Sequence, residues 1–515
     1  MSLPVSRPDA PHRRSSGRPR SQQHGERGGR TSHWSRPWTL DDVLFAGLML
    51  GLAWAPFWFG GNRPLAWMVN IIAFSALMLA YELSLARARA PYPVSPLRIW
   101  VPLALFALVG IWILLQSSTH LPARLDNGIW GLAQEALSRA VPGAISIDPD
   151  TTRLGLLTLL PPVVAFWLAL QLGRETRRAR LLIFALALIS SLYAVYALVA
   201  LHVFPGTLLW FTKVDYIPFA TSTFVNRNSY ATYAGLGVLS CICALSGQFA
   251  GTSSSRSSVW RRWATVLLTR GAVLPCLLFF GLALNLLALM LSVSRAGIAC
   301  SLAAIVIFFV LSAWRTGFRW FQLAALAIVG VLILSVVSGF DDLVSSRVAA
   351  QGFVDPLRWA IVRLSGVALM DRPLLGFGFA TFEEAFRIYR DASIVTGPGV
   401  DKAHNTYIEA MLGLGLPAFA MVMTGLAMLV SHCIKGVRAR RKDAEIPILA
   451  VTASVLVAAH ALVDFSMQMQ GVAITFAMIL GVGLSQSWPR EAPRPEDDRR
   501  SSNRRDPRGQ RGIVT

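Results

Sequence analysis

Long apolar runs alternate with short polar segments along most of the chain, and this alternation predicts membrane-spanning helices. At roughly 20 apolar residues per crossing of a bilayer core, the runs predict about twelve transmembrane helices. The fold class expected is therefore an all-α polytopic membrane bundle. The predicted helices cover residues 41–60, 64–84, 97–116, 152–172, 181–202, 226–247, 271–292, 296–312, 320–338, 405–431, 446–464 and 469–487.

Charge sets the expected orientation of these helices. Cytoplasmic loops of membrane proteins are enriched in Lys and Arg. Two polar tails, residues 1–39 and 488–515, are expected to be disordered and to lie on the same side, the cytoplasm. Between the tails we distinguish transmembrane regions 40–219 and 220–487. The basic loops that define this side are residues 86–90, 173–180, 253–263, 314–320 and 435–442.

Composition agrees with this class and narrows the partners. The chain is 54% hydrophobic and only 15% charged, which is too apolar for a soluble domain of 515 residues. The net charge of +20 lies in clusters between apolar runs, so the bilayer is the expected partner and nucleic acid is not. The five cysteines lack zinc-ligand spacing, and we expect no metal and no cofactor.

One long polar segment, residues 339–404, is predicted to be an extracytoplasmic loop. It has seven Lys or Arg and eight Asp or Glu, so it lacks the cytoplasmic bias. Apolar residues at three- and four-residue steps near 359–369 and 382–389 predict two short helices joined by "DRPLLGFGFATF". These helices would lie on the membrane surface or cover the mouth of the bundle.

His404 and Asn405 lie at the predicted outer start of a helix, and two interpretations apply to them. In one, Asn405 caps the helix and His404 is solvated. In the other, neutral His404 takes a proton from a hydroxyl as that hydroxyl attacks a substrate.

Arginines on the extracytoplasmic side form a second group of candidates. Arg295 in "SVSRAG" and Arg227 in "FVNRN" start helices where the charge rule gives no reason for a basic residue. Each either extends toward the membrane interface or binds a phosphate. Arg358 and Arg363 in the long loop would join such a site or pair with nearby aspartates. Lys213 is a weaker candidate, because it is equally compatible with a solvated charge.

His460 and Asp464 are four residues apart and are predicted to share one helical face at the outer end of helix 446–464. A carboxylate beside an imidazole fixes its tautomer and raises its basicity. The alternative is a structural hydrogen bond that closes the bundle.

The chain has no phosphate-binding G-x-x-x-x-G-K-[ST] loop and no D-x-D cluster for a metal-bound nucleotide sugar. If the protein transfers a group to an acceptor, the donor of that group is therefore more naturally a lipid-linked phosphate than a cytoplasmic nucleotide. A transporter or flippase also fits about twelve helices, but transporters place polar groups near the bilayer midplane and show repeated halves. Here the polar candidates gather at one face and the halves look dissimilar.

Several of these motifs together resemble the O-antigen ligase and O-antigen polymerase family, membrane glycosyltransferases that use polyprenyl-diphosphate-linked glycans at the periplasmic face. The resemblance covers about residues 220 to 485, with the first helices matching only in number and side. The motifs are "FVNRN", "SVSRAG", "RPLLGFGFATF", "AHNTYIEAMLGLGLPA" and "HALVDFSMQ", in this order.

The resemblance implies His404 as the general base that activates an acceptor hydroxyl. Arg295 and Arg227 would hold the donor diphosphate, and Arg358 or Arg363 would be the basic residue of the long loop. Substrate binding is expected from Arg227, Arg295, Arg358, Arg363, Asn405, His460 and Asp464.

The resemblance also implies a place and a reaction. The protein would lie in the bacterial inner membrane with both termini cytoplasmic, and it would need neither metal nor ATP. The acceptor would be lipid A-core, as in a ligase, or a growing O-antigen or exopolysaccharide chain, as in a polymerase. Transfer of the glycan to a protein hydroxyl is a further alternative.

Overall fold

The structure, a computed structural model, describes residues 39–249, 273–316, 356–391, 394, 400–440 and 443–489. The chain separates into two units, Met1–Thr39 and Leu40–Thr515, and every helix below belongs to the second. The predicted helix 320–338 and both predicted tails lie outside the described residues, apart from a few residues at their edges.

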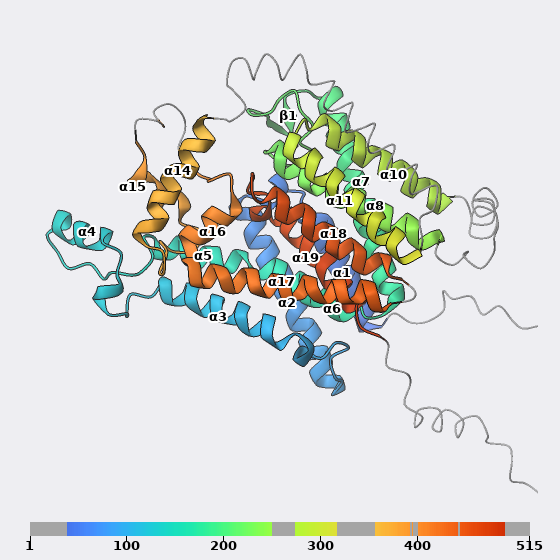
Figure 1. Cartoon of the computed structure of the whole chain (residues 1–515), viewed down its shortest axis with the longest axis horizontal. Helices are drawn as coiled ribbons and strands as arrows, with labels where there is room; N and C mark the ends of the chain where they lie inside the picture. The colour runs from blue at the N-terminus through green and yellow to red at the C-terminus, as the bar shows by residue number, and fades with distance from the viewer. Residues whose placement is uncertain are drawn as a thin grey trace, which may run out of the picture. The chain divides into compact units, whose positions relative to one another are not determined.

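Nearly all the regular secondary structure of the described residues is helical, which confirms the all-α class (Figure 1). One two-residue antiparallel pair, β1 (Thr207–Leu208) with β2 (Phe211–Thr212), interrupts them. Short 3₁₀ turns are η2 (Phe59–Gly61), η3 (Pro96–Ile99), η4 (Ala123–Leu125) and η7 (Ser466–Gln468). The α-helices are α1 (Leu40–Trp54), α2 (Pro64–Ala88), α3 (Trp100–Gln116), α4 (Ile129–Leu137), α5 (Pro149–Thr158), α6 (Leu160–Leu172), α7 (Thr176–His202), α8 (Arg227–Phe249), α10 (Val273–Leu291), α11 (Arg295–Thr316), α14 (Pro356–Asp371), α15 (Phe382–Tyr389), α16 (Thr406–Leu414), α17 (Leu416–Ala439), α18 (Glu445–His460) and α19 (Gln470–Ser485).

Eight helical segments within the described residues are long and apolar enough to cross a membrane. Two more apolar helices, α18 and α19, have 16 residues each and are shorter than that. The first predicted span, 41–60, corresponds to α1, which ends at Trp54. The described residues therefore support a membrane helical bundle, and they do not confirm the predicted number of twelve spans. The eight segments are Pro64–Ala88, Pro96–Gln116, Pro149–Leu172, Thr176–His202, Arg227–Gln248, Val273–Leu291, Arg295–Arg315 and Leu416–Ala439.

The prediction of one helix over 405–431 is wrong, because the chain breaks at Gly415 between α16 and α17. Gly415 has φ +78°, in the left-handed region that favours glycine. A Cβ at this position would lie 2.2 Å from the carbonyl oxygen of Leu374. The close approach is held by the amide of Leu416, which donates to Pro373 O at 2.8 Å. The break directs α16 away from the axis of α17.

The core of the bundle forms around α8 and α19, and Figure 1 shows these helices among their neighbours. α8 packs against α7, α10, α11 and α18, while α19 packs against α6 and α18. α17 lies along α3 on one side and α18 on the other. Their shared core contains Leu168, Leu236, Leu449 and Ile479, each at most 1% exposed.

Basic residues gather where several of these helices begin or end. Arg178, near the start of α7, pairs with both aspartates in the first turn of α1. Arg180 of α7 pairs with Asp443, just before α18. Arg174 and Arg315 donate to main-chain carbonyls at the ends of α19 and α17. Carbonyls at helix ends favour cations. We call this region the basic end; the opposite ends of α11, α18 and α19 carry the polar residues described next.

The two predicted helices of the long segment are present as α14 and α15, which pack on each other and on α16. Phe377, Phe382 and Phe386 fill the core between them. The glycine-rich connection lies against α16, since the amides of Phe377 and Gly378 donate to carbonyls of Leu412 and Gly413. This small cluster of helices fixes the chain that leads into His404.

Candidate functional site

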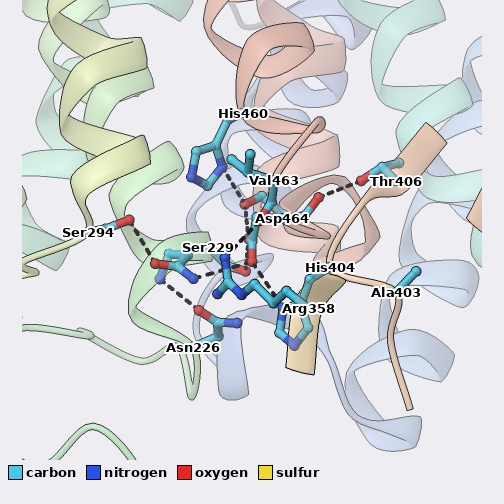
Figure 2. A network of polar contacts seen from close by, with 12 residues as sticks. Asn226, Ser229, Ser294, Arg358, Ala403, His404, Thr406, His460, Val463 and Asp464 are labelled. Atoms are coloured by element: carbon cyan, nitrogen blue, oxygen red, sulfur yellow. Dashed lines mark hydrogen bonds and ion pairs between the residues drawn. The ribbon is translucent and has the colours of Figure 1, made fainter. Parts of the chain in front are cut away.

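Asp464 lies at the centre of a polar network in the turn after α18, and its side chain is only 1% exposed. Its Oδ2 accepts hydrogen bonds from Ser466 Oγ at 2.5 Å and Ser229 Oγ at 3.4 Å. Asn228 Nδ2 approaches Oδ1 at 3.5 Å. Figure 2 shows Ser229 and His404, which come from distant parts of the chain, close to this carboxylate.

The environment keeps Asp464 ionised. Burial alone would raise the pKa of the carboxyl group, but His404, His460 and the Ser466 hydroxyl act in the opposite direction and lower it below its ordinary value. Charge and hydrogen bonding thus outweigh desolvation here. A buried negative charge is available to an imidazole beside it.

His404 is that imidazole. Its Nδ1 lies 3.9 Å from Asp464 Oδ1, an ion-pair distance longer than a hydrogen bond. The ring packs against Phe465 with centroids 5.2 Å apart and remains 28% exposed. The backbone at His404 is left-handed, with φ +52°, which is uncommon for a residue with a side chain. One edge of the ring thus faces Asp464, and part of the ring remains accessible to a substrate.

Hydrogen bonds of Glu409 and Thr406 help to hold this strained segment and to join it to the turn between α18 and α19. Glu409 accepts from the amide of Ala403 at 2.7 Å and from Gln468 Nε2 at 2.5 Å. The Thr406 hydroxyl donates to Asp464 O at 2.9 Å. We did not single out Gln468 or Thr406 from the sequence. Both lie inside the quoted motifs, but only the fold shows their partners.

Asn405 caps α16, as one of the two interpretations of the sequence predicted. Its Oδ1 accepts from the amides of Tyr407 and Ile408 at 3.0 and 3.1 Å, and its Nδ2 donates to Leu462 O at 2.9 Å. Both ends of the amide are engaged by the protein, which favours a structural role over substrate binding.

His460 is the last residue of α18 and is 1% exposed. The prediction that it shares a helical face with Asp464 is wrong, because α18 ends before Asp464. The two are connected through Ser466: His460 Nδ1 lies 3.1 Å from Ser466 Oγ and 2.8 Å from Thr232 Oγ1. Nε2 is buried and has no hydrogen-bond partner within the described residues. If Nδ1 carries the proton, the unpartnered Nε2 is an acceptor and no N–H donor is left buried without a partner. The tautomer with the proton on Nδ1 is therefore favoured.

Arg227 and Arg295 are the first residues of α8 and α11. The Ser294 hydroxyl donates to Asn228 Oδ1 at 2.8 Å and so joins the starts of the two helices. Each arginine is adjacent in sequence to one partner of this bond, and Arg295 is exposed. Helix starts attract anions through their unpaired amides and the helix dipole. The pair of helix starts therefore has the chemistry of an anion-binding surface.

Aromatic rings hold the guanidinium of Arg227. Its Cζ lies 4.3 Å from the ring centroid of Phe219 and 5.5 Å from that of Tyr216. Both rings come from the loop that precedes α8. Such stacking is a cation–π contact and restricts where the arginine points.

The structure separates the two arginines of the long loop. Arg358 Nη1 donates a long hydrogen bond, 3.5 Å, to the carbonyl of Val463, next to Asp464. Arg363 instead pairs with Asp391 at 2.8 Å, and both side chains are about half exposed. Of the two, only Arg358 is brought to the network (Figure 2).

Taken together, the site places a partly exposed imidazole beside a buried carboxylate, with three arginines on the surrounding elements. An imidazole beside a carboxylate can take a proton from a hydroxyl, and guanidinium groups bind phosphates. Asn228, Ser229, Thr232, Ser294 and Ser466 complete the network and were not predicted from the sequence. Small hydroxyl and amide residues near helix ends are too common to signal a site alone.

Part of the chain is similar to a known protein family. Residues 280–423 match the family model described as O-antigen ligase. The match begins inside α10, includes Arg295, Arg358 and His404, and ends within α17. This match supports the assignment of the chain to the O-antigen ligase family, which is also the family that the sequence motifs resemble. A comparison with curated proteins found no match.

Proposed function

We propose that this member of the O-antigen ligase family is a glycosyltransferase of the bacterial inner membrane. It transfers a glycan from a polyprenyl-diphosphate carrier to an acceptor hydroxyl at the periplasmic face. The observation that carries this proposal is the position of His404 beside ionised Asp464. Arg227 and Arg295 start the neighbouring helices α8 and α11.

In the proposed reaction, His404 accepts the proton of the acceptor hydroxyl as its oxygen attacks the anomeric carbon of the donor glycan. The bond between that carbon and the diphosphate oxygen breaks, and polyprenyl diphosphate leaves with the bonding electrons. Asp464 stabilises the imidazolium that forms, and the proton then passes to solvent. Asp464 is a positioning residue in this scheme, and His460 positions it through Ser466.

Negative charge develops on the leaving diphosphate, and Arg227, Arg295 and Arg358 are proposed to balance it. Because the diphosphate is already an activated leaving group, the scheme requires neither metal nor ATP. Transfer by purified protein is therefore expected to persist in EDTA. Loss of transfer in EDTA, restored by a divalent cation, would contradict this part of the proposal.

The basic end supports the proposed orientation. Cytoplasmic ends of membrane helices are the basic ones, so we propose that the site at the opposite ends of α11 and α18 faces the periplasm and that the start of α1 faces the cytoplasm. Single cysteines test this in a cysteine-free variant. Asp401→Cys is expected to react with a membrane-impermeant maleimide in intact spheroplasts, and Lys435→Cys only after lysis; both positions are exposed.

The experiment that tests the function compares surface polysaccharide and lipid-linked glycan in cells with a deletion, wild type or His404→Ala. The proposal expects His404→Ala to match the deletion and lipid-linked glycan to accumulate. Finished chains on the lipid indicate a ligase with a lipid A-core acceptor, and single repeat units indicate a polymerase. Normal surface polysaccharide, with an unglycosylated envelope protein, indicates transfer to protein. A normal profile for all products rejects the function.

A further inference from the structure

Lys213 is a buried lysine that the proposed reaction does not use. It follows β2 in the loop between α7 and α8 and is 9% exposed. Its Nζ donates to the carbonyl oxygen of Phe219 at 2.8 Å. Burial lowers the pKa of Lys213 to about 8, so the ammonium still carries its proton at pH 7. Burying such a group is costly unless it makes a useful contact.

The carbonyl that Lys213 holds belongs to the residue whose ring stacks on Arg227. The amide of Phe219 donates to Tyr216 O at 3.0 Å, so residues 216–219 form a tight turn. The amide of Ala220 donates to Leu291 O at 2.9 Å, at the end of α10. Lys213 therefore closes one side of the turn, and the end of α10 holds the other.

We propose that Lys213 is a positioning residue for the donor diphosphate: by holding Phe219, it keeps two aromatic rings against Arg227 and directs that guanidinium at the start of α8. This inference rests on the proposed function and assigns to the donor site a residue that does not touch the donor.

Geometry explains why the rings can aim the arginine without competing with the diphosphate. An aromatic ring that packs on the face of a guanidinium does not occupy the N–H donors that lie in the guanidinium plane. A phosphate is bound by those in-plane donors. Without the Lys213 contact, the turn gains freedom, and the diphosphate must then order Arg227 when it binds.

The test measures the Kd of purified detergent-solubilised protein for polyprenyl diphosphate without a glycan, so that no acceptor needs to be known. Lys213→Met, which keeps an apolar stem and removes the donor, is expected to weaken binding about tenfold, or about 1.4 kcal/mol. Lys213→Arg keeps a charged donor and is expected to recover most of the loss. Lys435→Met, at an exposed lysine of α17, is the matched control and leaves Kd unchanged.

A double-mutant cycle shows whether Lys213 acts through Arg227. If it does, Lys213→Met adds little to the weakening already caused by Arg227→Gln, because the two changes remove the same interaction. Full additivity, or a Lys213→Met Kd equal to that of wild type, overturns the inference. So does failure of Lys213→Arg to restore binding.

The same measurement separates this inference from the proposed function. If wild type binds polyprenyl diphosphate no better than the uncharged polyprenol, the donor assignment fails, and the inference falls with it. If wild type binds the diphosphate and Arg227→Gln weakens that binding, but Lys213→Met does not, the function stands and only the role of Lys213 is rejected.

Discussion

Nδ1 of His404 lies 3.9 Å from Oδ1 of Asp464, although one residue precedes α16 and the other follows α18. The second oxygen of Asp464 already accepts from Ser466 at 2.5 Å, so Oδ1 is the oxygen that faces the imidazole. A base that must carry positive charge for a moment gains from a fixed negative charge at this distance.

Replacing the imidazole is expected to remove catalysis while leaving the fold intact. We expect His404→Ala to lower the rate of glycan transfer by about 10²–10⁴-fold, the usual contribution of a general base. His432→Ala is the matched control: its ring bonds a carbonyl of its own helix, α17. Transfer rates are measured with purified protein and extracted lipid-linked glycan. A His404→Ala rate within threefold of the control would exclude the histidine as the base.

Acid is expected to weaken the fold through Asp464. Its pKa is lower in the folded protein than in the unfolded chain. The carboxylate therefore stabilises the fold fully above about pH 4, its ordinary range, and this contribution disappears as the pH falls through the lowered pKa. We expect the thermal midpoint of wild type to exceed that of Asp464→Asn at pH 6, with a gap that narrows below pH 4. A gap independent of pH would show that the charge does not stabilise the fold.

The two arginines of α14 are expected to behave differently, although they are only five residues apart. Arg358→Ala removes the guanidinium beside Val463 and is expected to lower transfer about tenfold or more, as for other hydrogen bonds to charged groups. Arg363→Ala removes an exposed ion pair with Asp391 and is expected to change transfer less than twofold. Equal losses of transfer rate in both variants, at equal thermal stability, would mean that Arg358 contributes no more to the site than Arg363 does.

Gly415 is expected to tolerate no side chain. Gly415→Ala forces a Cβ to within 2.2 Å of a carbonyl and keeps φ at +78°, which costs about 1–3 kcal/mol for the backbone alone. A lowered thermal midpoint is expected. Gly366→Ala in α14, where a Cβ has nothing within 4 Å, is expected to leave stability unchanged or to raise it slightly. Stability is followed by fluorescence-detected unfolding in detergent, and equal midpoints for the two variants would contradict the strained break.

The sequence predicted the fold class well because hydrophobic length is a strong local signal. Apolar runs become helices wherever backbone polar groups must be satisfied internally, and the described spans follow the predicted runs. Breaks were harder to predict. Gly415 and Pro417 end one helix and start another inside an apolar run, and the reason is the contact with Leu374, which is distant in sequence.

The site was predicted in parts. His404, Arg227 and Arg295 stand out because polar groups at helix starts in apolar surroundings are unusual. The choice between Arg358 and Arg363 depends on how α14 packs, which no spacing rule gives. The connection between His460 and Asp464 was misplaced because the end of α18 was predicted four residues too late. A shift of one helical turn replaces a direct contact with one through Ser466.

The polar network draws its members from widely separated parts of the chain: Ser229 from α8, Ser294 before α11, His404 before α16, and Asp464 with Ser466 between the last two helices. A chain leaving the ribosome inserts its helices from the N-terminus onward. Because the carboxylate and its hydroxyl partner lie between α18 and α19, a chain that stops before these two helices lacks both groups. The proposed chemistry therefore depends on the insertion of α18 and α19, and we expect a product truncated before α18 to be inert even if its earlier helices are correctly folded.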